Sequence, residues 1–108
     1  MKRRVVITGI GAITPIGNDA KTTWEQAKAG ANGIDHIKTF SVDGNEVKIG
    51  GEIKDFDFDE ALGRKFVKRM DRFIQLAMVA TKEAIEDSKL DFNNEDRDRC
   101  GVYYGSGI

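Results

Sequence analysis

The first thirty residues contain the pattern that most restricts the fold: an apolar run, a glycine-rich break and a helix. Residues 4–7 place three β-branched side chains in succession, which is typical of a strand buried on both faces of a parallel sheet. Three glycines and the single proline interrupt residues 9–17. Asn18 or Asp19 then provides a cap for a helix that ends before Gly30, a glycine positioned to adopt a left-handed conformation. Strand, glycine turn and helix together indicate the opening of an α/β fold.

The middle of the chain is irregular, and a long helix follows it. Residues 31–59 predict only a weak hairpin, with short strands at 46–49 and 52–54. After Asp71, the predicted N-cap residue, apolar and small residues recur with helical spacing. These positions are Phe73, Ile74, Ala77, Met78, Thr81, Ala84, Ile85 and Ser88. We expect this helix to be largely buried.

A second candidate strand, residues 100–104, lies near the end of the sequence and is followed by a glycine turn. The order β, α, irregular segment, α, β predicts an α/β fold in which helices pack on a mostly parallel sheet. Such a fold normally continues into another helix at this point. We therefore expect residues 1–108 to form a single, incomplete N-terminal domain.

Composition excludes several classes of protein. The 17 Lys and Arg residues nearly cancel the 18 Asp and Glu residues, so a net charge of −1 gives no indication of a nucleic-acid partner. One Cys and one His provide neither a disulfide nor a zinc-binding cluster, and we expect no metal. No run of about 18 apolar residues is present. These features predict a cytoplasmic protein that does not associate with membranes.

The glycine turn also raises the possibility of a nucleotide site. Gly9 and Gly11 follow a predicted strand, and glycines at such a turn allow a backbone to approach a pyrophosphate. However, Thr14 occupies the position of the third glycine in the dinucleotide-binding motif. A tight turn between strand and helix is favoured, while a nucleotide-binding oxidoreductase remains an alternative.

Motifs spaced along the whole chain carry a family resemblance. They are residues 2–11 with 14–18, Thr23-Trp24, Ala29-Gly30 with Gly33-Ile34, residues 69–75 (Arg-Met-Asp-Arg-Phe-Ile-Gln) and residues 105–108 (Gly-Ser-Gly-Ile). Together they closely resemble the opening of the beta-ketoacyl-[acyl-carrier-protein] synthase II family, although polyketide ketosynthases share several of them. One departure is Lys89, where the family usually has Gly. Lys89 must therefore adopt a left-handed conformation or the helix must end in another way.

The resemblance implies a thiolase-like layered α/β fold and a homodimeric parent enzyme without organic cofactor or metal. It implies decarboxylative Claisen condensation of an acyl thioester with malonyl-acyl-carrier-protein, the chain-elongating step of fatty-acid synthesis. The family's catalytic Cys lies in a Thr-Ala-Cys-Ala motif, which Cys100 does not match, and His36 matches neither family His motif. We expect Cys100 to be a buried, inert side chain and the 108-residue chain alone to be inactive. A non-catalytic fragment that binds acyl carrier protein is an alternative.

Two groups of residues are candidates for binding. Arg64, Lys65, Lys68 and Arg69 place four cations within six residues, and in a helix they would share one positive face. This face is either solvated and neutralised by the preceding acidic residues or, as the resemblance implies, docks the acidic acyl carrier protein. The resemblance also implies that Ile108 lines the acyl tunnel. Residues 55–59 alternate Asp and Phe like the start of a calcium loop, but Glu60 and Phe66 stand where that loop needs Gly and Glu.

Overall fold

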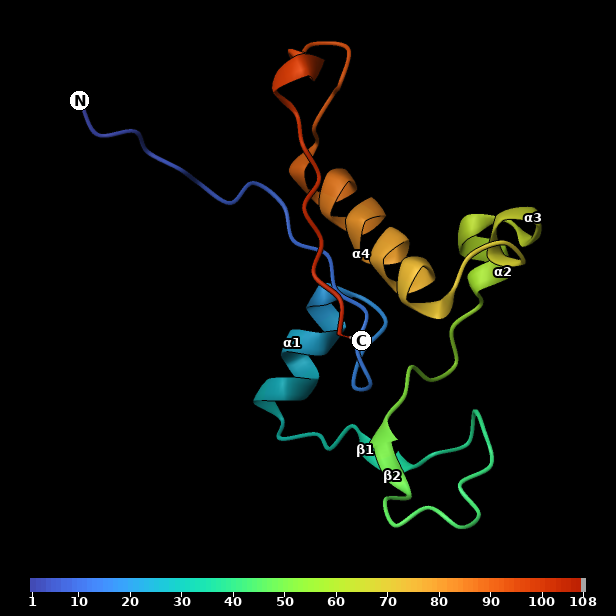
Figure 1. The fold of residues 1–108 in the computed structure, drawn as a ribbon. Coiled ribbons are helices and arrows are strands. Elements are labelled where there is room, and N and C mark those ends of the chain that lie inside the picture. Colours follow the sequence, from blue (N-terminus) through green and yellow to red (C-terminus); the bar gives the residue numbers. More distant parts are fainter. Residues whose placement is uncertain (108) are drawn as a thin grey trace.

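The computed structural model describes residues 1–107 and contains one long helix with shorter elements around it (Figure 1). In chain order the elements are α1 (Ala20–Lys28), β1 (Ile34–His36), β2 (Ile49–Gly51), α2 (Phe58–Leu62), α3 (Arg64–Val67), α4 (Arg72–Ser88) and the 3-10 turn η1 (Arg97–Arg99). Figure 1 shows α1 at one side of α4, the β1–β2 ribbon below, and α2 with α3 beyond the start of α4.

The ends of α1 follow the capping residues expected from the sequence. Asp19 has an extended backbone, and its carboxylate accepts from the Thr22 amide at 2.6 Å and from the Thr22 hydroxyl at 2.9 Å. Beyond the helix, Gly30 has φ of +73°, the left-handed conformation that lets the chain leave the helix. Both predictions are confirmed because helix ends depend on residues that are adjacent in the chain.

The long helix α4 also lies where its periodicity predicted, with Asp71 as N-cap residue. At its C-terminal end Lys89 has φ of +55°, a left-handed conformation in a residue that carries a Cβ. Ser88 assists this termination, since its hydroxyl donates to the Ile85 carbonyl at 2.8 Å and accepts from the Leu90 amide at 3.2 Å. Burial is less complete than predicted, since only Gln75 in this helix is classed as buried.

The glycine turn packs directly on α4. A Cβ placed on Gly9 would overlap the Ala84 carbonyl oxygen, and one on Gly11 would overlap the Ala80 carbonyl oxygen. Only glycine therefore allows the two backbones to approach this closely. Close packing on a helix, a role that sequence reasoning did not specify, explains these two glycines.

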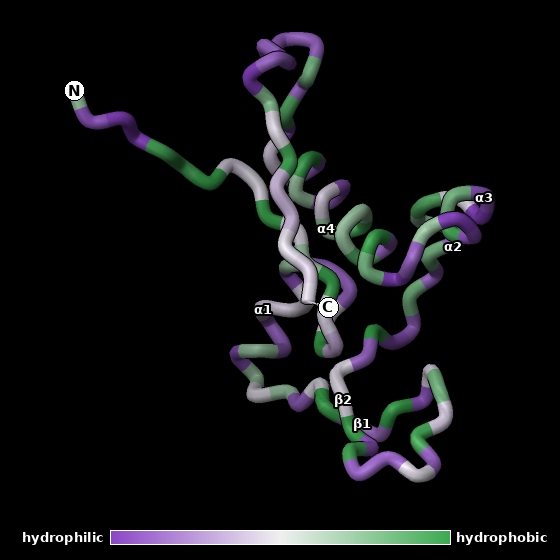
Figure 2. The backbone as a smooth tube through the Cα atoms, viewed as in Figure 1, coloured by the Kyte–Doolittle hydropathy of each residue, from purple (hydrophilic) through white to green (hydrophobic). Residues whose placement is uncertain are grey.

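The two predicted sheet strands are not formed in this structure. Residues 4–7 and 100–104 have no strand assignment, and Val5 and Tyr103 are 94% and 96% exposed. Figure 2 shows the N-terminal segment as a hydrophilic end followed by an apolar stretch that runs away from the other elements. A parallel strand requires backbone hydrogen bonds to neighbouring strands, and none is found for these segments within residues 1–107.

The irregular region does contain a two-stranded antiparallel ribbon, but its strands are not the two that were predicted. β1 pairs with β2 so that Ile34 lies opposite Gly51 and His36 opposite Ile49. The predicted strand at 46–49 overlaps β2 only at its last residue, and residues 52–54 are not a strand. The strand that pairs with β2 is β1, which lies earlier in the chain than either predicted strand. A long loop, residues 37–48, connects the two, and local turn signals do not reveal a pairing across such a loop.

The chain as a whole is open. Its accessible surface of 9332 Å² exceeds the value of about 6,000 Å² expected for a compact monomer of this mass. Its radius of gyration is 16.9 Å, against about 13 Å for a compact domain of this length. Among residues 1–107, Phe58 is the one apolar side chain classed as buried. No helix described in this range combines the length and apolar character needed to cross a bilayer.

Candidate functional site

Four cations project from the short turn that contains α3. Gly63, with φ of +85°, ends α2 and begins α3, so the chain changes direction sharply between them. The Lys68 amide donates to the Arg64 carbonyl at 3.2 Å, and the Arg69 amide donates to the Phe66 carbonyl at 2.9 Å. The helix α3 itself ends at Val67, and a tighter turn carries the chain through Lys68 and Arg69. We call Arg64, Lys65, Lys68 and Arg69 the basic face.

All four side chains of the basic face are exposed, and none of them forms an ion pair with another side chain of residues 1–107. The ion pairs found among residues 1–107 involve Lys28, Lys38 and Lys54, and none involves the basic face. Of the preceding acidic residues, Asp57 caps α2 by accepting from the Glu60 amide at 2.9 Å. Direct neutralisation of the basic face by these acids is thus not observed, and four mutually repelling charges remain available to an external anion.

A buried glutamine fixes the connection between the basic face and α4. Gln75 is 7% exposed, and its Nε2 donates to the Val67 carbonyl at 3.1 Å and to the Met70 carbonyl at 2.9 Å. Its Oε1 accepts from Arg72 at 3.2 Å, and the Arg72 guanidinium lies 4.4 Å from the centroid of the Phe58 ring. These contacts anchor the end of α3 to the first turns of α4. Sequence reasoning did not assign this role, although a lone amide within an apolar helical stripe is a detectable signal.

Phe66 is a second residue that sequence reasoning did not select. It lies in α3 between the two pairs of cations, and its side chain is 62% exposed. The site therefore combines four positive charges with one exposed aromatic ring. A large apolar side chain within a charge cluster is an additional signal for a protein interface.

The glycine turn provides no nucleotide site. The Ile10 amide donates to Asp87 Oδ2 at 3.0 Å, and the Ala12 amide donates to Glu83 Oε2 at 2.8 Å. The other Glu83 oxygen accepts from the amide of Ala20, at the start of α1, at 2.8 Å. Amides that would cradle a phosphate are thus occupied by two carboxylates, whose charge repels phosphate. This geometry argues against the oxidoreductase alternative.

Cys100 is exposed, so the prediction that it is buried was wrong. It follows η1, and its thiol lies 3.4 Å from the Asp96 carbonyl oxygen. His36 lies on β1, and Figure 1 shows β1 and the η1 turn at opposite ends of the molecule. The two residues are therefore not brought together as a catalytic pair.

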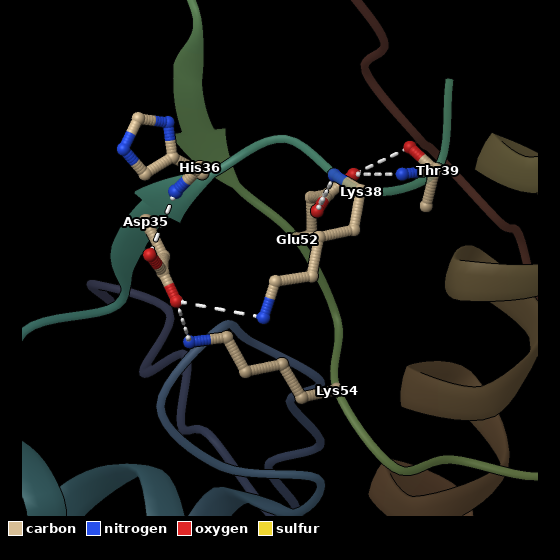
Figure 3. A network of polar contacts seen from close by, with 6 residues as sticks. All are labelled: Asp35, His36, Lys38, Thr39, Glu52 and Lys54. Carbon is tan, nitrogen blue, oxygen red and sulfur yellow. Dashed lines mark hydrogen bonds and ion pairs between the residues drawn. The ribbon is translucent and has the colours of Figure 1, made fainter. Parts of the chain in front are cut away.

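Figure 3 shows a polar network that supports the β1–β2 ribbon. The Glu52 carboxylate accepts from the Thr39 hydroxyl and from the amides of Lys38 and Thr39, at 2.9 and 3.0 Å for the amides. The hydroxyl bond, followed by the Lys38 amide, lowers the pKa of Glu52. The His36 amide, assisted by the charges of Lys38 and Lys54, lowers the pKa of Asp35. Both carboxylates are engaged in structural bonds, and no group of three or more metal-ligating side chains occurs in the described part of the chain.

Comparison with a solved structure first defines the class of protein. The chain aligns with the ishigamide ketosynthase/chain length factor at a TM-score of 0.78 and 29% sequence identity, over 87% of this chain and 23% of that one. The thiolase-like α/β class expected from the sequence is therefore confirmed, although the central strands are not paired within these residues.

Sequence comparison then gives the family. Residues 2–108 match the model for the beta-ketoacyl synthase N-terminal domain, and the chain belongs to that family. It is 51% identical over 106 residues to 3-oxoacyl-[acyl-carrier-protein] synthase 2 of Staphylococcus aureus strain N315, covering 98% of this chain. It is 48% identical over 107 residues to the protein of the same name from Synechocystis sp., covering 99% of this chain. The chain spans 26% of the length of each of these relatives.

Proposed function

We propose that residues 1–108 correspond to the first part of the N-terminal ketosynthase domain of a condensing enzyme in fatty-acid elongation. The observation that supports this is the identity of about half the residues along nearly the whole chain to two 3-oxoacyl-[acyl-carrier-protein] synthases. Such an enzyme is an acyltransferase. We further propose that the complete protein is a cytoplasmic homodimer, as the family resemblance implies.

The proposed reaction joins an acyl group held as an enzyme thioester to malonyl-acyl-carrier-protein. The malonyl carboxylate leaves as carbon dioxide, and the resulting carbanion forms a carbon–carbon bond to the acyl carbonyl. The enzyme carbon–sulfur bond breaks, which restores the cysteine thiol and releases 3-oxoacyl-acyl-carrier-protein. Neither Cys100 nor His36 is arranged for these steps, so the described residues contribute binding.

The basic face is the proposed docking site for acyl carrier protein. Its four cations are exposed and have no internal ion pairs among residues 1–107, and Gln75 anchors the connection between this turn and α4. An acidic carrier would relieve the repulsion among the cations and would be attracted over a distance set by the ionic strength. Long-range attraction of this kind raises the association rate more than it slows dissociation.

A charge-reversal experiment tests this docking role. We expect Lys65→Glu/Lys68→Glu to weaken binding of a purified bacterial acyl carrier protein by at least about tenfold at low salt, with a smaller effect at high salt. The matched control is Lys2→Glu/Arg3→Glu, which changes the net charge equally at an exposed site in the N-terminal segment. Calorimetric titration measures both affinities. Equal losses of affinity in the two variants would show that the basic face acts only through the net charge of the chain. Unchanged affinity in both variants would refute docking at the basic face.

A non-catalytic carrier-binding module is the second candidate function for the 108-residue chain. It is favoured by the contrast between a basic face that is complete in this chain and a Cys and His that lie at opposite ends of it. The purified chain should bind the carrier yet form no 3-oxoacyl product from acyl- and malonyl-acyl-carrier-protein. Product formation would contradict this second function.

The acyl-pocket role of Ile108 also remains a proposal, because Ile108 lies outside the described residues. Its support is the match of residues 105–108 to the Gly-Ser-Gly-Ile motif of the family. Ile108→Ala in a complete enzyme should broaden the range of accepted chain lengths. An unchanged product profile would remove Ile108 from the proposed pocket.

A further inference from the structure

Phe66 is an exposed aromatic side chain in the same turn as the basic face. It precedes Lys68 and Arg69 and follows Arg64 and Lys65, so cations flank the ring on both sides in sequence. Most of the side chain is accessible, at 62% exposure. The cation–π contacts found among residues 1–107 involve the rings of Trp24 and Phe58, so the Phe66 ring is not engaged by the cations around it.

An exposed phenylalanine in a charge cluster can contribute to the binding free energy when a partner covers it. Burying a phenylalanine side chain contributes roughly 1.5–3 kcal/mol relative to leaving it exposed. In protein interfaces, buried aromatic side chains at the centre contribute most of the affinity, while surrounding charges exclude water and select the partner. Phe66 combines an exposed ring with cations that precede and follow it in the chain. It fits a partner that presents an apolar patch within an acidic surface.

The support beneath α3 makes the Phe66 position suitable for binding. The Gln75 side chain donates hydrogen bonds to the carbonyls of Val67 and Met70, and Gly63 allows the chain to change direction before α3. The backbone that follows Phe66 is therefore held by hydrogen bonds before a partner arrives. A side chain on a pre-ordered backbone loses less conformational entropy on binding than one on a mobile loop.

The charges near α3 favour a compact acidic protein over a nucleic acid. Aromatic rings and cations can also form a stacking platform for single-stranded nucleic acid. However, Asp57, Asp59 and Glu60 lie at the start of α2, immediately before the basic face. A phosphate backbone that extended past the four cations would meet these carboxylates, whereas a small acidic helical surface can end at the basic face.

We propose that Phe66 is the apolar anchor of the docking surface: its ring is buried against an apolar patch on the acyl carrier protein, while the four cations of the basic face contact acidic residues beside that patch. This inference rests on the proposed docking function. The Phe66 contact would contribute binding free energy that salt does not screen, whereas the contacts of the four cations weaken as the salt concentration rises.

Substitutions at Phe66 separate this contribution from that of the charges. We expect Phe66→Ala to weaken binding of a bacterial acyl carrier protein by about tenfold at both low and high salt, because the lost contact is apolar. Phe66→Leu should retain most of the affinity. The control is Phe40→Ala, which removes another exposed phenylalanine on the loop between β1 and β2. Circular dichroism of each variant checks that the helices are intact.

The possible outcomes distinguish the anchor from the docking function. If Phe66→Ala binds like the unmodified chain while Lys65→Glu/Lys68→Glu loses affinity, the anchor is refuted and docking stands. If the unmodified chain does not bind the carrier, the docking function fails and the anchor fails with it. Binding of single-stranded RNA that is tighter than carrier binding and is lost in Phe66→Ala would assign the ring to nucleic acid, and would also overturn the proposal.

Discussion

The packed junction of the glycine turn with α4 and the exposed turn around α3 differ in where their residues find partners. At the junction, Gly11 permits backbone contact with α4, and Glu83 accepts hydrogen bonds from two amides far away in the chain. At the α3 turn, the cations and Phe66 project into solvent. Internal contacts thus explain the residues of the junction, whereas those of the α3 turn require a partner. Substitutions should accordingly affect stability in the first region and binding in the second.

The largest expected effect on stability is at Gly11. Gly11→Ala places a methyl group against the Ala80 backbone, so α4 must move away, and we expect a loss of about 3 kcal/mol in the free energy of unfolding. Gly105→Ala is the matched control, since a Cβ there meets no atom within 4 Å. Urea denaturation of both variants measures the difference. Equal stabilities would mean that the turn does not pack closely on α4 in solution.

The next effect is at Glu83, which joins three segments of the chain. Glu83→Ala leaves the amides of Ala12 and Ala20 without their acceptor, and we expect a loss of about 2 kcal/mol in the free energy of unfolding. Glu86→Ala removes a carboxylate from an exposed position of the same helix and should change stability little. In the absence of denaturant, both variants should bind acyl carrier protein with the same affinity. A carrier-binding defect specific to Glu83→Ala would show that the two regions are coupled.

Smaller effects are expected where the backbone is left-handed. Lys89→Gly should raise the free energy of unfolding by about 1 kcal/mol, because glycine adopts φ of +55° without a Cβ penalty. Gly30→Ala should lower it by a similar amount, since Gly30 has φ of +73° and is surrounded by open space. Thermal unfolding of the pair should therefore give shifts of opposite sign. Shifts of the same sign would show that backbone strain does not control these helix ends.

The smallest effect concerns pH. Hydrogen bonds from the Thr22 amide and hydroxyl lower the pKa of Asp19 below its ordinary value of 3.8. A depressed folded-state pKa contributes stability that is present above the unfolded pKa and is lost as the pH falls through the folded value. Asp19→Asn retains an acceptor for the cap but does not titrate. Its stability should accordingly decline less than that of the unmodified chain between mildly and strongly acidic pH. Parallel declines would show that this carboxylate does not contribute.

Residues that act through near neighbours in sequence could be predicted, whereas those that depend on distant partners could not. Asp19 as a cap and Gly30 as a left-handed exit follow from local chemistry, and the sequence also anticipated the constraint on Lys89. The pairing of β1 with β2 depends on a contact across a long loop, and the exposure of Cys100 depends on what covers its segment.

The candidate site shows the same division. The cations of the basic face were evident from their spacing, and their exposure agrees with a solvated or docking surface. The roles of Gln75 and Phe66 were missed because a hydropathy pattern predicts that an amide is exposed and that an aromatic ring is buried, and these two residues do the opposite. Their roles emerge only when the end of α3 is placed against α4.

The most direct test is to map carrier binding on the chain by NMR. Titration of the isotopically labelled chain with acyl carrier protein should shift the amide signals of residues 63–70 and of the first turn of α4. The signals of residues 9–12 and of α1 should remain in place. Shifts centred on the glycine turn or on α1, with residues 63–70 unchanged, would contradict the assignment of the basic face as the docking site.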